Sequence, residues 1–259
     1  MLIPSLTPLE WALALASAAL VGFSKTGVPG TGILVVPLMA ALFGGRESVG
    51  ILLPMLIFAD CFAVAWYRRH ARWDRLWALI PWVLAGMALG AGTLQMLGPA
   101  EGSRDRLSVL IGVLVLVMLA LSLARGRWGE RLVPHSRAGS ALTGVAAGFA
   151  TAVSNAAGPV MSLYFLSAGL NKSEFMGSFA WYFFIFNLIK VPIFAALTAA
   201  DPQHPMFSAS SLTFNLLVAP MIAVGAVAGR WLLPRIPQKV FDDAVLVLAA
   251  AAALRLILG

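Results

Sequence analysis

Residues 22–32 read Gly-Phe-Ser-Lys-Thr-Gly-Val-Pro-Gly-Thr-Gly. This polar, glycine-rich stretch interrupts an apolar run that covers residues 8–43. A second interruption begins 126 positions later, where residues 148–159 read Gly-Phe-Ala-Thr-Ala-Val-Ser-Asn-Ala-Ala-Gly-Pro. The Gly-Phe pairs that open the two stretches align without a gap, as do Gly32 and Gly158. Two helix-breaking patches inside apolar sequence of membrane-spanning length predict two hairpins whose tips lie within a membrane.

The composition identifies the class of protein. The chain has 259 residues, of which 60% are hydrophobic and 11% charged, and its mean hydropathy is +0.89. A soluble domain of this length cannot bury that much apolar surface. Apolar runs long enough to span a bilayer recur along the sequence, and they are continuous rather than alternating, which excludes a β-barrel. We therefore expect an all-α polytopic membrane protein in contact with the lipid bilayer.

The apolar runs and their breaks predict the order of the elements. The first element covers about 7–43 with a break at 24–30, and a later one covers about 138–170 with a break at 151–158. Each is followed by three unbroken helices. These are expected at about 47–67, 76–97 and 105–124 in the first half, and at about 174–199, 210–233 and 238–258 in the second.

This order indicates two repeats within one domain, 1–259. Repeat 1 covers 1–124, a basic loop covers 125–137, and repeat 2 covers 138–259. The spacing of helix-breaking residues supports the division, because Pro81, Gly86 and Gly90 recur 139 positions later as Pro220, Gly225 and Gly229.

The charges of the loops predict the topology. The loops 68–75 and 125–137 each contain four arginines, and the loop 230–239 contains three cations, so all three should be cytoplasmic. The loop 200–209 has no lysine or arginine and should be external. The net charge of +7 is thus explained by cytoplasmic loops, without a nucleic-acid partner.

On this topology the element 138–170 starts and ends on the cytoplasmic side. It must enter and return, as a re-entrant hairpin. By the repeat, 7–43 is the corresponding hairpin and enters from outside. The two halves then have opposite orientations, which is the inverted repeat of many secondary transporters, and both termini are external.

Broken backbone within hydrocarbon is tolerated where protein or a water-filled cavity satisfies its polar groups. The two breaks therefore point to an internal site, and the N-termini of the returning helices would favour an anion there. Lys25 is the leading candidate ligand, because a buried lysine needs a partner or a function. The alternatives are that it snorkels from a shallow tip or pairs with Asp60. Further candidates for substrate binding from the two breaks are Ser24, Thr26, Gly27, Gly30, Thr31, Gly32, Ser154, Asn155 and Gly158.

The glycines among these candidates have a second interpretation, which is tight helix packing. The hydroxyl groups could likewise bond only their own backbone. Ser154 or Asn155 could cap the second returning helix.

Three polar residues within crossing helices are candidates for coupling or charge pairing. Asp60 and Asn187 correspond at an offset of 127 positions. Asp60 could pair with Lys25 or Lys190, or carry a proton, and Lys190 could snorkel toward the membrane surface.

The sequence contains no catalytic or metal-binding motif. The three histidines lie in expected loops without metal spacing, and a single cysteine, Cys61, provides neither a disulfide nor a thiolate cluster. We therefore expect no cofactor, no metal and no enzymatic activity. The sequence does not indicate an oligomeric state.

The two breaks resemble a known family. The residues from Gly22 to Gly32, followed by Leu34 and Pro37, and the second series from Gly148-Phe149 to Asn155-Ala156-Ala157-Gly158-Pro159 are similar to the TauE/SafE sulfite exporter family. The resemblance covers essentially the whole chain. It implies a permease of the bacterial inner membrane for sulfite, sulfoacetate and related sulfonates, usually working in the direction of export.

Taken together, residues and resemblance predict a secondary transporter. It would move a small sulfur-containing anion by alternating access, with the site between the hairpin tips. Efflux of an anion needs no coupled ion where the cell interior is negative, and proton coupling through Asp60 is the alternative. A channel-like anion pore of the same fold and an importer of another small carboxylate or organic anion are the rival interpretations.

Overall fold

The structure is a computed structural model that describes residues 4–27, 31–97, 105–128, 137–232 and 238–258. Within these ranges every regular element is a helix, which confirms the predicted all-α class. In the first half the helices are α1 (Pro8–Thr26), η1 (Thr31–Leu34), α2 (Val35–Phe43), α3 (Gly45–Tyr67), η2 (Arg68–His70), α4 (Trp73–Met96) and α5 (Arg106–Trp128). In the second half they are α6 (Arg137–Ser154), α7 (Gly158–Ser167), α8 (Lys172–Ala200), α9 (Ala209–Leu232) and α10 (Gln238–Leu258).

Among the described residues, five helices are long and apolar enough to cross a membrane. They cover Gly45–His70, Trp73–Met96, Arg106–Ala124, Lys172–Ala200 and Ala209–Trp231. Their outward surfaces expose large apolar side chains, such as Trp77, Leu89 and Leu216, which suits contact with lipid. The prediction of a polytopic helical membrane protein is therefore confirmed.

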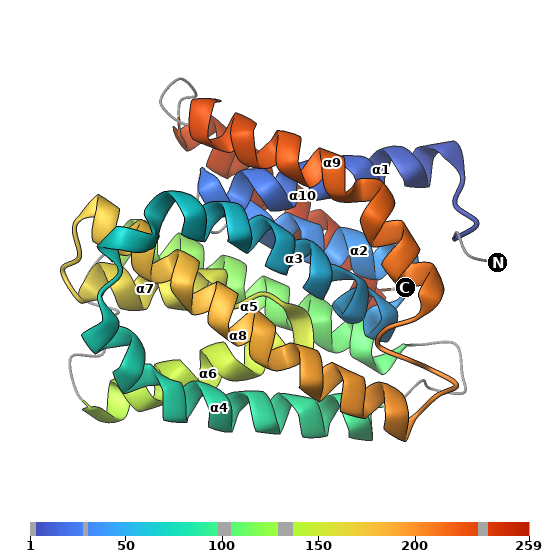
Figure 1. The fold of residues 1–259 in the computed structure, drawn as a ribbon, viewed down its shortest axis with the longest axis horizontal. Coiled ribbons are helices and arrows are strands. Elements are labelled where there is room, and N and C mark those ends of the chain that lie inside the picture. The colour runs from blue at the N-terminus through green and yellow to red at the C-terminus, as the bar shows by residue number, and fades with distance from the viewer. Residues whose placement is uncertain (1–3, 28–30, 98–104, 129–136, 233–237, 259) are drawn as a thin grey trace.

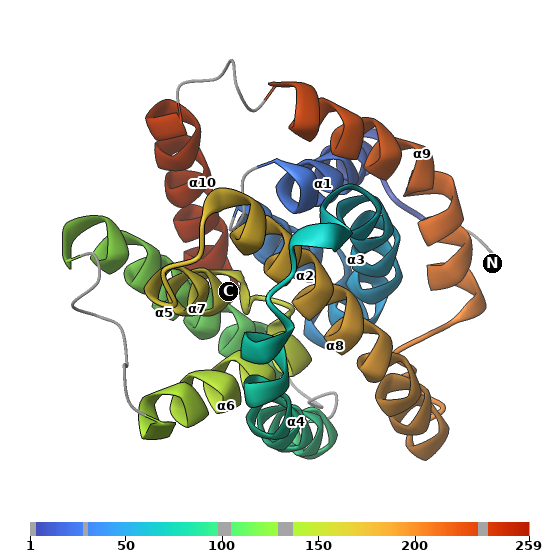
Figure 2. The same ribbon diagram turned by 60° about the vertical axis from the view of Figure 1, so that its left-hand side comes forward.

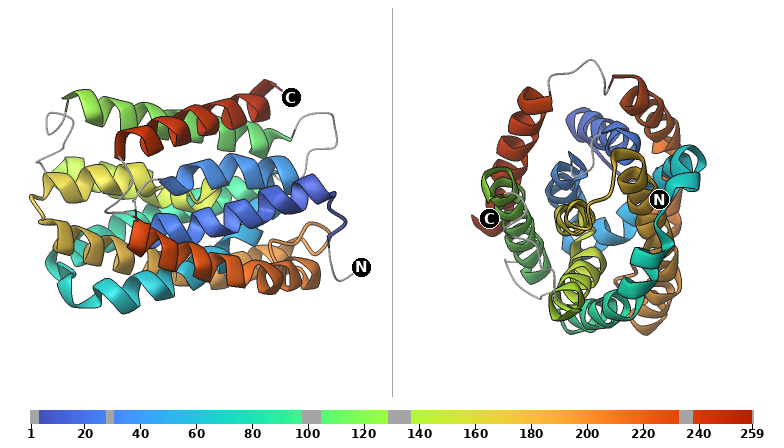
Figure 3. Two further views of the ribbon diagram at one scale, coloured as in Figure 1. Left: turned by 90° about the horizontal axis from the view of Figure 1, so that it is seen from above. Right: turned by 90° about the vertical axis from the view of Figure 1, so that its left-hand side faces the viewer.

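The broken elements form two hairpins that enter from opposite ends. In Figure 1, α1 runs inward from the end where the N-terminus is marked, and α2 runs back to that end. The other hairpin, α6 and α7, enters from the opposite end and returns to it, which the left view of Figure 3 also shows. The start of α1 and the end of α10 lie at the same end of the molecule. This arrangement agrees with an inverted repeat, which stays a prediction, as does the orientation in the membrane.

The two breaks begin later than predicted. Helix α1 continues through Ser24, Lys25 and Thr26, and α6 continues through Ser154, so these residues lie on the last turns of helices. The predicted boundaries of the breaks, 24–30 and 151–158, were wrong by up to a turn. Serine and threonine have modest helix propensity but continue a helix when their hydroxyls bond carbonyls one turn back, as Ser154 Oγ does at 2.8 Å from Ala150 O.

The first helix of each hairpin, α1 or α6, makes its most extensive contacts with a helix from the other half of the chain. Helix α1 packs along α9, and α4 packs along α6. Figure 2 shows these two pairs on opposite sides of the molecule, with α3 and α8 crossing between them and α5 beside α10. The right view of Figure 3, along the helices, shows the same separation. The tips of both hairpins are thereby brought to the middle of the molecule.

Glycines allow the close approach in both pairs. A Cβ added to Gly225 would lie 1.9 Å from Ala19 O, and one added to Gly86 would lie 2.1 Å from Val145 O. Each glycine is thus at a point where only a hydrogen fits between two backbones, as in small-residue interfaces of membrane helices. The contacts correspond, since Gly225 follows Gly86 by 139 positions, the offset that the glycine and proline spacing indicated.

One carboxylate ties the starts of two crossing helices. Asp105 Oδ2 accepts hydrogen bonds from the Gly45 N–H at 2.7 Å and from the Ser108 hydroxyl at 2.6 Å, and Oδ1 accepts one from the Leu107 N–H at 3.0 Å. These bonds satisfy free N–H groups at the starts of both α3 and α5. In the second half, α8 begins at the neutral cap Asn171, whose Oδ1 accepts from the N–H groups of Ser173 and Glu174.

Candidate anion site

Among the side chains whose burial the structure describes, three buried ones are of a charged type. Lys25 on α1 is 8% exposed, while Asp60 on α3 and Lys190 on α8 are fully buried. All three lie well within the helical core, where an isolated charge is more costly than a pair of opposite charges. Their partners therefore indicate what this part of the molecule can do.

The first cluster joins α1, α3 and α8. Lys25 Nζ lies 2.8 Å from Asp60 Oδ1, and Asp60 Oδ2 accepts a hydrogen bond of 2.6 Å from Asn187 Nδ2. The Lys25 ammonium also stands over the ring of Phe183, 4.1 Å from its centroid, in a cation–π contact. Of the alternatives left open for Lys25, the structure shows the pair with Asp60. The sequence indicated only that Asn187 and Asp60 correspond at an offset of 127 positions, and the structure adds a hydrogen bond between them.

The second cluster joins α8 to the tip of the second hairpin. Lys190 Nζ donates to Thr151 O at 3.1 Å, to Thr151 Oγ1 at 3.3 Å and to Asn155 Oδ1 at 2.5 Å. Lys190 is fully buried, so the expectation that it could snorkel to the membrane surface was wrong. The described acceptors of its hydrogen bonds are neutral oxygens on the hairpin, which hold the side chain inward.

Asn155 connects this cluster to the rest of the tip. Its φ of 56° is left-handed, and its N–H bonds to Thr151 O at 3.2 Å. This is the αL motif that ends a helix, so Asn155 closes α6, and the expectation that it could cap the returning helix was wrong. Its side-chain Nδ2 donates to Val49 O on α3 at 3.1 Å, so Asn155 ties the hairpin tip to α3 as well as α8.

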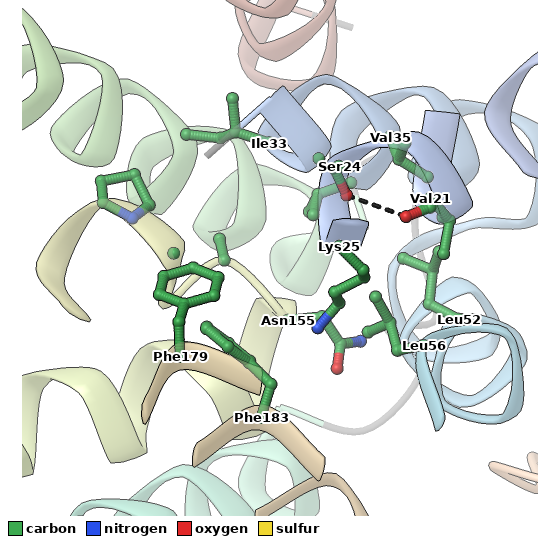
Figure 4. A pocket seen from close by; sticks show the side chains of 15 residues that line it. Val21, Ser24, Lys25, Ile33, Val35, Leu52, Leu56, Asn155, Phe179 and Phe183 are labelled. Atoms are coloured by element: carbon green, nitrogen blue, oxygen red, sulfur yellow. Dashed lines mark hydrogen bonds between the residues drawn. The ribbon is translucent and has the colours of Figure 1, made fainter. Parts of the chain in front are cut away.

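A cavity of about 50 Å³ lies between the two tips. Since one water needs roughly 10–15 Å³ on this scale, it has room for about three to five waters or a small oxyanion. Its polar lining includes Lys25 and Ser24 from the first hairpin and Asn155 from the second, and Phe179 and Phe183 form an aromatic wall. Figure 4 shows Lys25 and Asn155 reaching into the same side of the cavity from the two tips.

The structure brings half of the predicted binding residues to this cavity. Lys25, Ser24, Gly32, Asn155 and Gly158 line it. Gly158 and Pro159 belong to the first turn of α7, and both line the cavity. The N–H groups of a first turn have no carbonyl partner within the helix, and they can bind an anion. Pro159 has no N–H group and does not contribute to this.

Other predicted binding residues lie away from the cavity lining. The Thr26 hydroxyl bonds Ala226 O at 2.6 Å and Gly22 O at 3.3 Å, and thereby fastens α1 to α9. A Cβ on Gly27 would lie 3.0 Å from Gly229 O, which fits the interpretation as a packing glycine. Ser154 and Thr31 are buried outside the lining, and Gly30 lies outside the described residues.

A model of the family described as sulfite exporter TauE/SafE matches residues 14–256. The chain belongs to the TauE/SafE family. It is therefore a multi-pass membrane protein of a family of anion transporters. Neither the curated proteins nor the solved structures that were searched contain a match.

Sequence reasoning missed two features of this TauE/SafE protein. Phe179 and Phe183 were not among the predicted site residues, yet both line the cavity and Phe183 contacts the Lys25 ammonium. Thr151 was not among the predicted site residues, yet its carbonyl and hydroxyl oxygens accept hydrogen bonds from Lys190. The spacing of Phe179 and Phe183, one helical turn apart on the face that also carries Asn187 and Lys190 a turn further on, was the available signal.

Proposed function

We propose that this protein exports sulfite or a small organosulfonate across the bacterial inner membrane, with the cavity between the hairpin tips as the substrate site. One observation carries the proposal. A lysine ammonium, an asparagine side chain and the first turn of a helix converge on a cavity of small-ion size. An anion there would meet the Lys25 charge, hydrogen-bond donors and the positive end of the α7 dipole together.

Binding requires that the substrate compete with Asp60 for Lys25. The 2.8 Å contact neutralises Lys25 in the unloaded site, which would otherwise hold a buried, unpaired cation. A sulfonate or sulfite oxygen that enters the cavity would share the ammonium with Asp60 or draw it away. The buried pair thus stabilises the empty carrier and leaves a cation available to the substrate.

Alternating access would open the cavity to one end of the molecule at a time. At each end of the molecule, a polar interaction joins two helices or connections and could break and re-form to open or close that end. At one end Arg46 Nε donates to His204 O at 2.8 Å and joins α3 to the α8–α9 connection. At the other end Arg72 Nη1 lies 3.3 Å from Glu174 Oε1 and joins the α3–α4 connection to α8. Release of one interaction while the other holds would expose the site to one side.

The driving force is proposed to be the membrane potential. Moving one negative charge out of a cell with a negative interior gains about 2.3 kcal/mol per 100 mV. Proton coupling through Asp60 is the alternative. Efflux of methanesulfonate, whose charge does not change near neutral pH, separates the two when it is measured in proteoliposomes at clamped potential with and without a pH gradient. Only the coupled carrier should respond to the gradient.

Counterflow in proteoliposomes tests the proposed function. Vesicles loaded with unlabelled sulfite should accumulate radiolabelled sulfite transiently, and the initial rate should saturate with external sulfite. A channel-like pore gives no counterflow and a flux without saturation. Absence of counterflow for sulfite, methanesulfonate and sulfoacetate alike would refute the proposal, and counterflow with a carboxylate alone would favour the rival transporter.

Accessibility labelling tests the proposed orientation. In a Cys61→Ala background, Ser173→Cys places a single thiol at the exposed start of α8. An impermeant maleimide should label it from the cytoplasmic face of the membrane. Labelling from outside the cell would reverse the proposed orientation of the second hairpin and, with it, the external placement of both termini.

A further inference from the structure

The charges around the cavity do not cancel. Lys25 and Asp60 form one pair, whereas Lys190 is bonded to the neutral oxygens of Thr151 and Asn155. Among the side chains whose burial the structure describes, which do not include those of residues 125–137, 166–167, 232–246 and 248, no fourth buried one is of a charged type. In their usual charge states the three groups therefore sum to one positive charge in the core of the molecule.

The excess charge is coupled to the cavity through a single side chain. Asn155 accepts from Lys190 on one side and lines the cavity beside Lys25 on the other. The remaining walls are largely apolar, formed by Phe179, Phe183 and aliphatic residues of α1, α2 and α3. A substrate that brings one negative charge makes the loaded core neutral, whereas a second negative charge would be buried against apolar walls without a partner.

We propose that the site is selective for compact monoanions. Hydrogensulfite and short alkanesulfonates satisfy this description, while sulfate, thiosulfate and sulfoacetate carry two negative charges near neutral pH and are excluded. The inference rests on the proposed function and narrows its substrate class. Lys190 acts as a positioning residue, since its charge reaches the substrate through Asn155.

Methanesulfonate and sulfate are the matched pair of test anions. Both are tetrahedral and of similar size, and they differ in having a methyl group or a charged oxygen at one corner. As competitors of sulfite counterflow by the wild-type protein, methanesulfonate should be at least about 100-fold more potent than sulfate, because an unpaired buried charge costs several kcal/mol. Potencies within about tenfold of each other, with counterflow intact, would overturn this inference and leave the proposed function standing.

Variants that change the summed charge of Lys25, Asp60 and Lys190 test the proposal directly. Lys190→Met removes the one net positive charge and should reduce methanesulfonate binding at least about 100-fold. Asp60→Asn raises the sum to two positive charges, so the preference for methanesulfonate over sulfate should shrink at least about tenfold. The double variant Asp60→Asn/Lys190→Met returns the sum to one and should regain the preference. The potency ratio is informative because a merely structural defect lowers both potencies and leaves their ratio unchanged.

The control is Lys172→Met, an exposed lysine at the start of the same helix, which should leave the ratio unchanged. Where Lys190→Met does not give a monodisperse protein, the double variant carries the test. A double variant that prefers sulfate, or an Asp60→Asn variant with the wild-type ratio, would overturn the proposal. If none of the variants folds, the wild-type ratio of methanesulfonate to sulfate decides.

Discussion

The tips of the two hairpins are each fastened to a crossing helix by a lysine, with donor and acceptor exchanged. At the first tip the lysine is on the hairpin, as Lys25, and its acceptor Asp60 is on α3. At the second tip the lysine is on the helix, as Lys190 of α8, and its acceptors are on the hairpin. The mechanical role is the same in both halves. The charge differs, because the first contact is an ion pair and the second leaves a cation without a carboxylate.

The two halves of the chain are therefore similar in how their helices pack and different in the charges that they carry. Thr151 stands where Lys25 would be expected from the offset of 126 positions, and Asn187 stands where Asp60 would be expected from the offset of 127. The second half thus has a neutral residue at both positions of the first half's ion pair. A framework with nearly equivalent halves then holds an asymmetric site, which is useful for a charged substrate that must be both bound and released.

The largest effect is expected from breaking the first contact. Lys25→Met removes the charge at the cavity and leaves Asp60 buried and unpaired, which should cost about 3–5 kcal/mol of stability and at least about 100-fold in transport. Thermal unfolding in detergent and sulfite counterflow measure the two effects. The double variant Lys25→Met/Asp60→Asn should regain most of the stability and none of the transport. Transport by the double variant at the wild-type rate would remove Lys25 from the site.

The second largest effect on transport is expected when the contact of Lys190 with the second hairpin is changed into an ion pair like that of Lys25 with Asp60. Asn155→Asp gives Lys190 a carboxylate, so the excess positive charge disappears and anion transport should fall at least about tenfold. The variant loses the bond to Val49 O but gains an ion pair, so its melting temperature should stay within a few degrees of the wild type. Asn155→Gly is the control, because glycine accepts the left-handed backbone and keeps Lys190 without a carboxylate. Equal transport by Asn155→Asp and the wild type would contradict the asymmetry in charge.

A smaller effect, equal in both halves, is expected at the glycine contacts. Gly86→Ala and Gly225→Ala would each place a Cβ about 2 Å from a carbonyl oxygen of the partner helix, and each should cost about 1–3 kcal/mol. Gly92→Ala on the same helix as Gly86 meets nothing within 4 Å and should be neutral or stabilising by up to about 1 kcal/mol. Thermal unfolding is the measurement. A large cost at one of the two glycines and none at the other would break the equivalence of the two packing contacts.

The smallest effect is expected at the helix starts, where the first half has a carboxylate and the second an amide. Burial raises the pKa of Asp105, but hydrogen bonds from the Ser108 hydroxyl and from the N–H groups of Gly45, Ser108 and Leu107 outweigh it, so the pKa lies below its usual value. A lowered pKa stabilises the fold above the unfolded value of about 3.9, and this stability is lost as the pH falls through the folded pKa.

Asp105→Asn should therefore cost about 0.5–1 kcal/mol at neutral pH and flatten the loss of stability below about pH 4. Melting curves from pH 3 to pH 7 measure this, and Asn171→Ala, which removes a neutral cap, should lower stability without changing its dependence on pH. If Asp105→Asn lost stability below about pH 4 as the wild type does, another carboxylate would be responsible for that loss.

Much of the fold follows from the sequence, because it depends on apolar length and on glycine and proline. The two breaks, the crossing helices and the correspondence of Gly86 with Gly225 were all predicted from spacing. Lys25, Asp60 and Asn187 were identified as candidates because polar residues within apolar helices are costly and therefore informative. Spacing cannot assign their partners, and Asp60 could equally have paired with Lys190.

The remaining features of the site depend on three-dimensional contacts. That Thr26 fastens α1 to α9 rather than facing the cavity follows from the rotation of α1, which continues one turn beyond its expected end. That Asn155 closes α6 follows from its left-handed backbone, which asparagine tolerates but does not require. Phe183 gains its role from the helix opposite, which brings the Lys25 ammonium over its ring.

The exchange of packing partners between the halves has a consequence for how the protein is made. The Thr26 hydroxyl bonds a carbonyl 200 positions later in the chain. At about 5–20 residues per second, the ribosome needs roughly 10–40 s to supply that partner after α1 has emerged. Throughout that interval α9 is not yet there to cover the face of α1 that carries Gly22. Insertion of this chain therefore depends on something else in the membrane, such as lipid or the insertion machinery, to shelter the first helix until nearly the last one arrives.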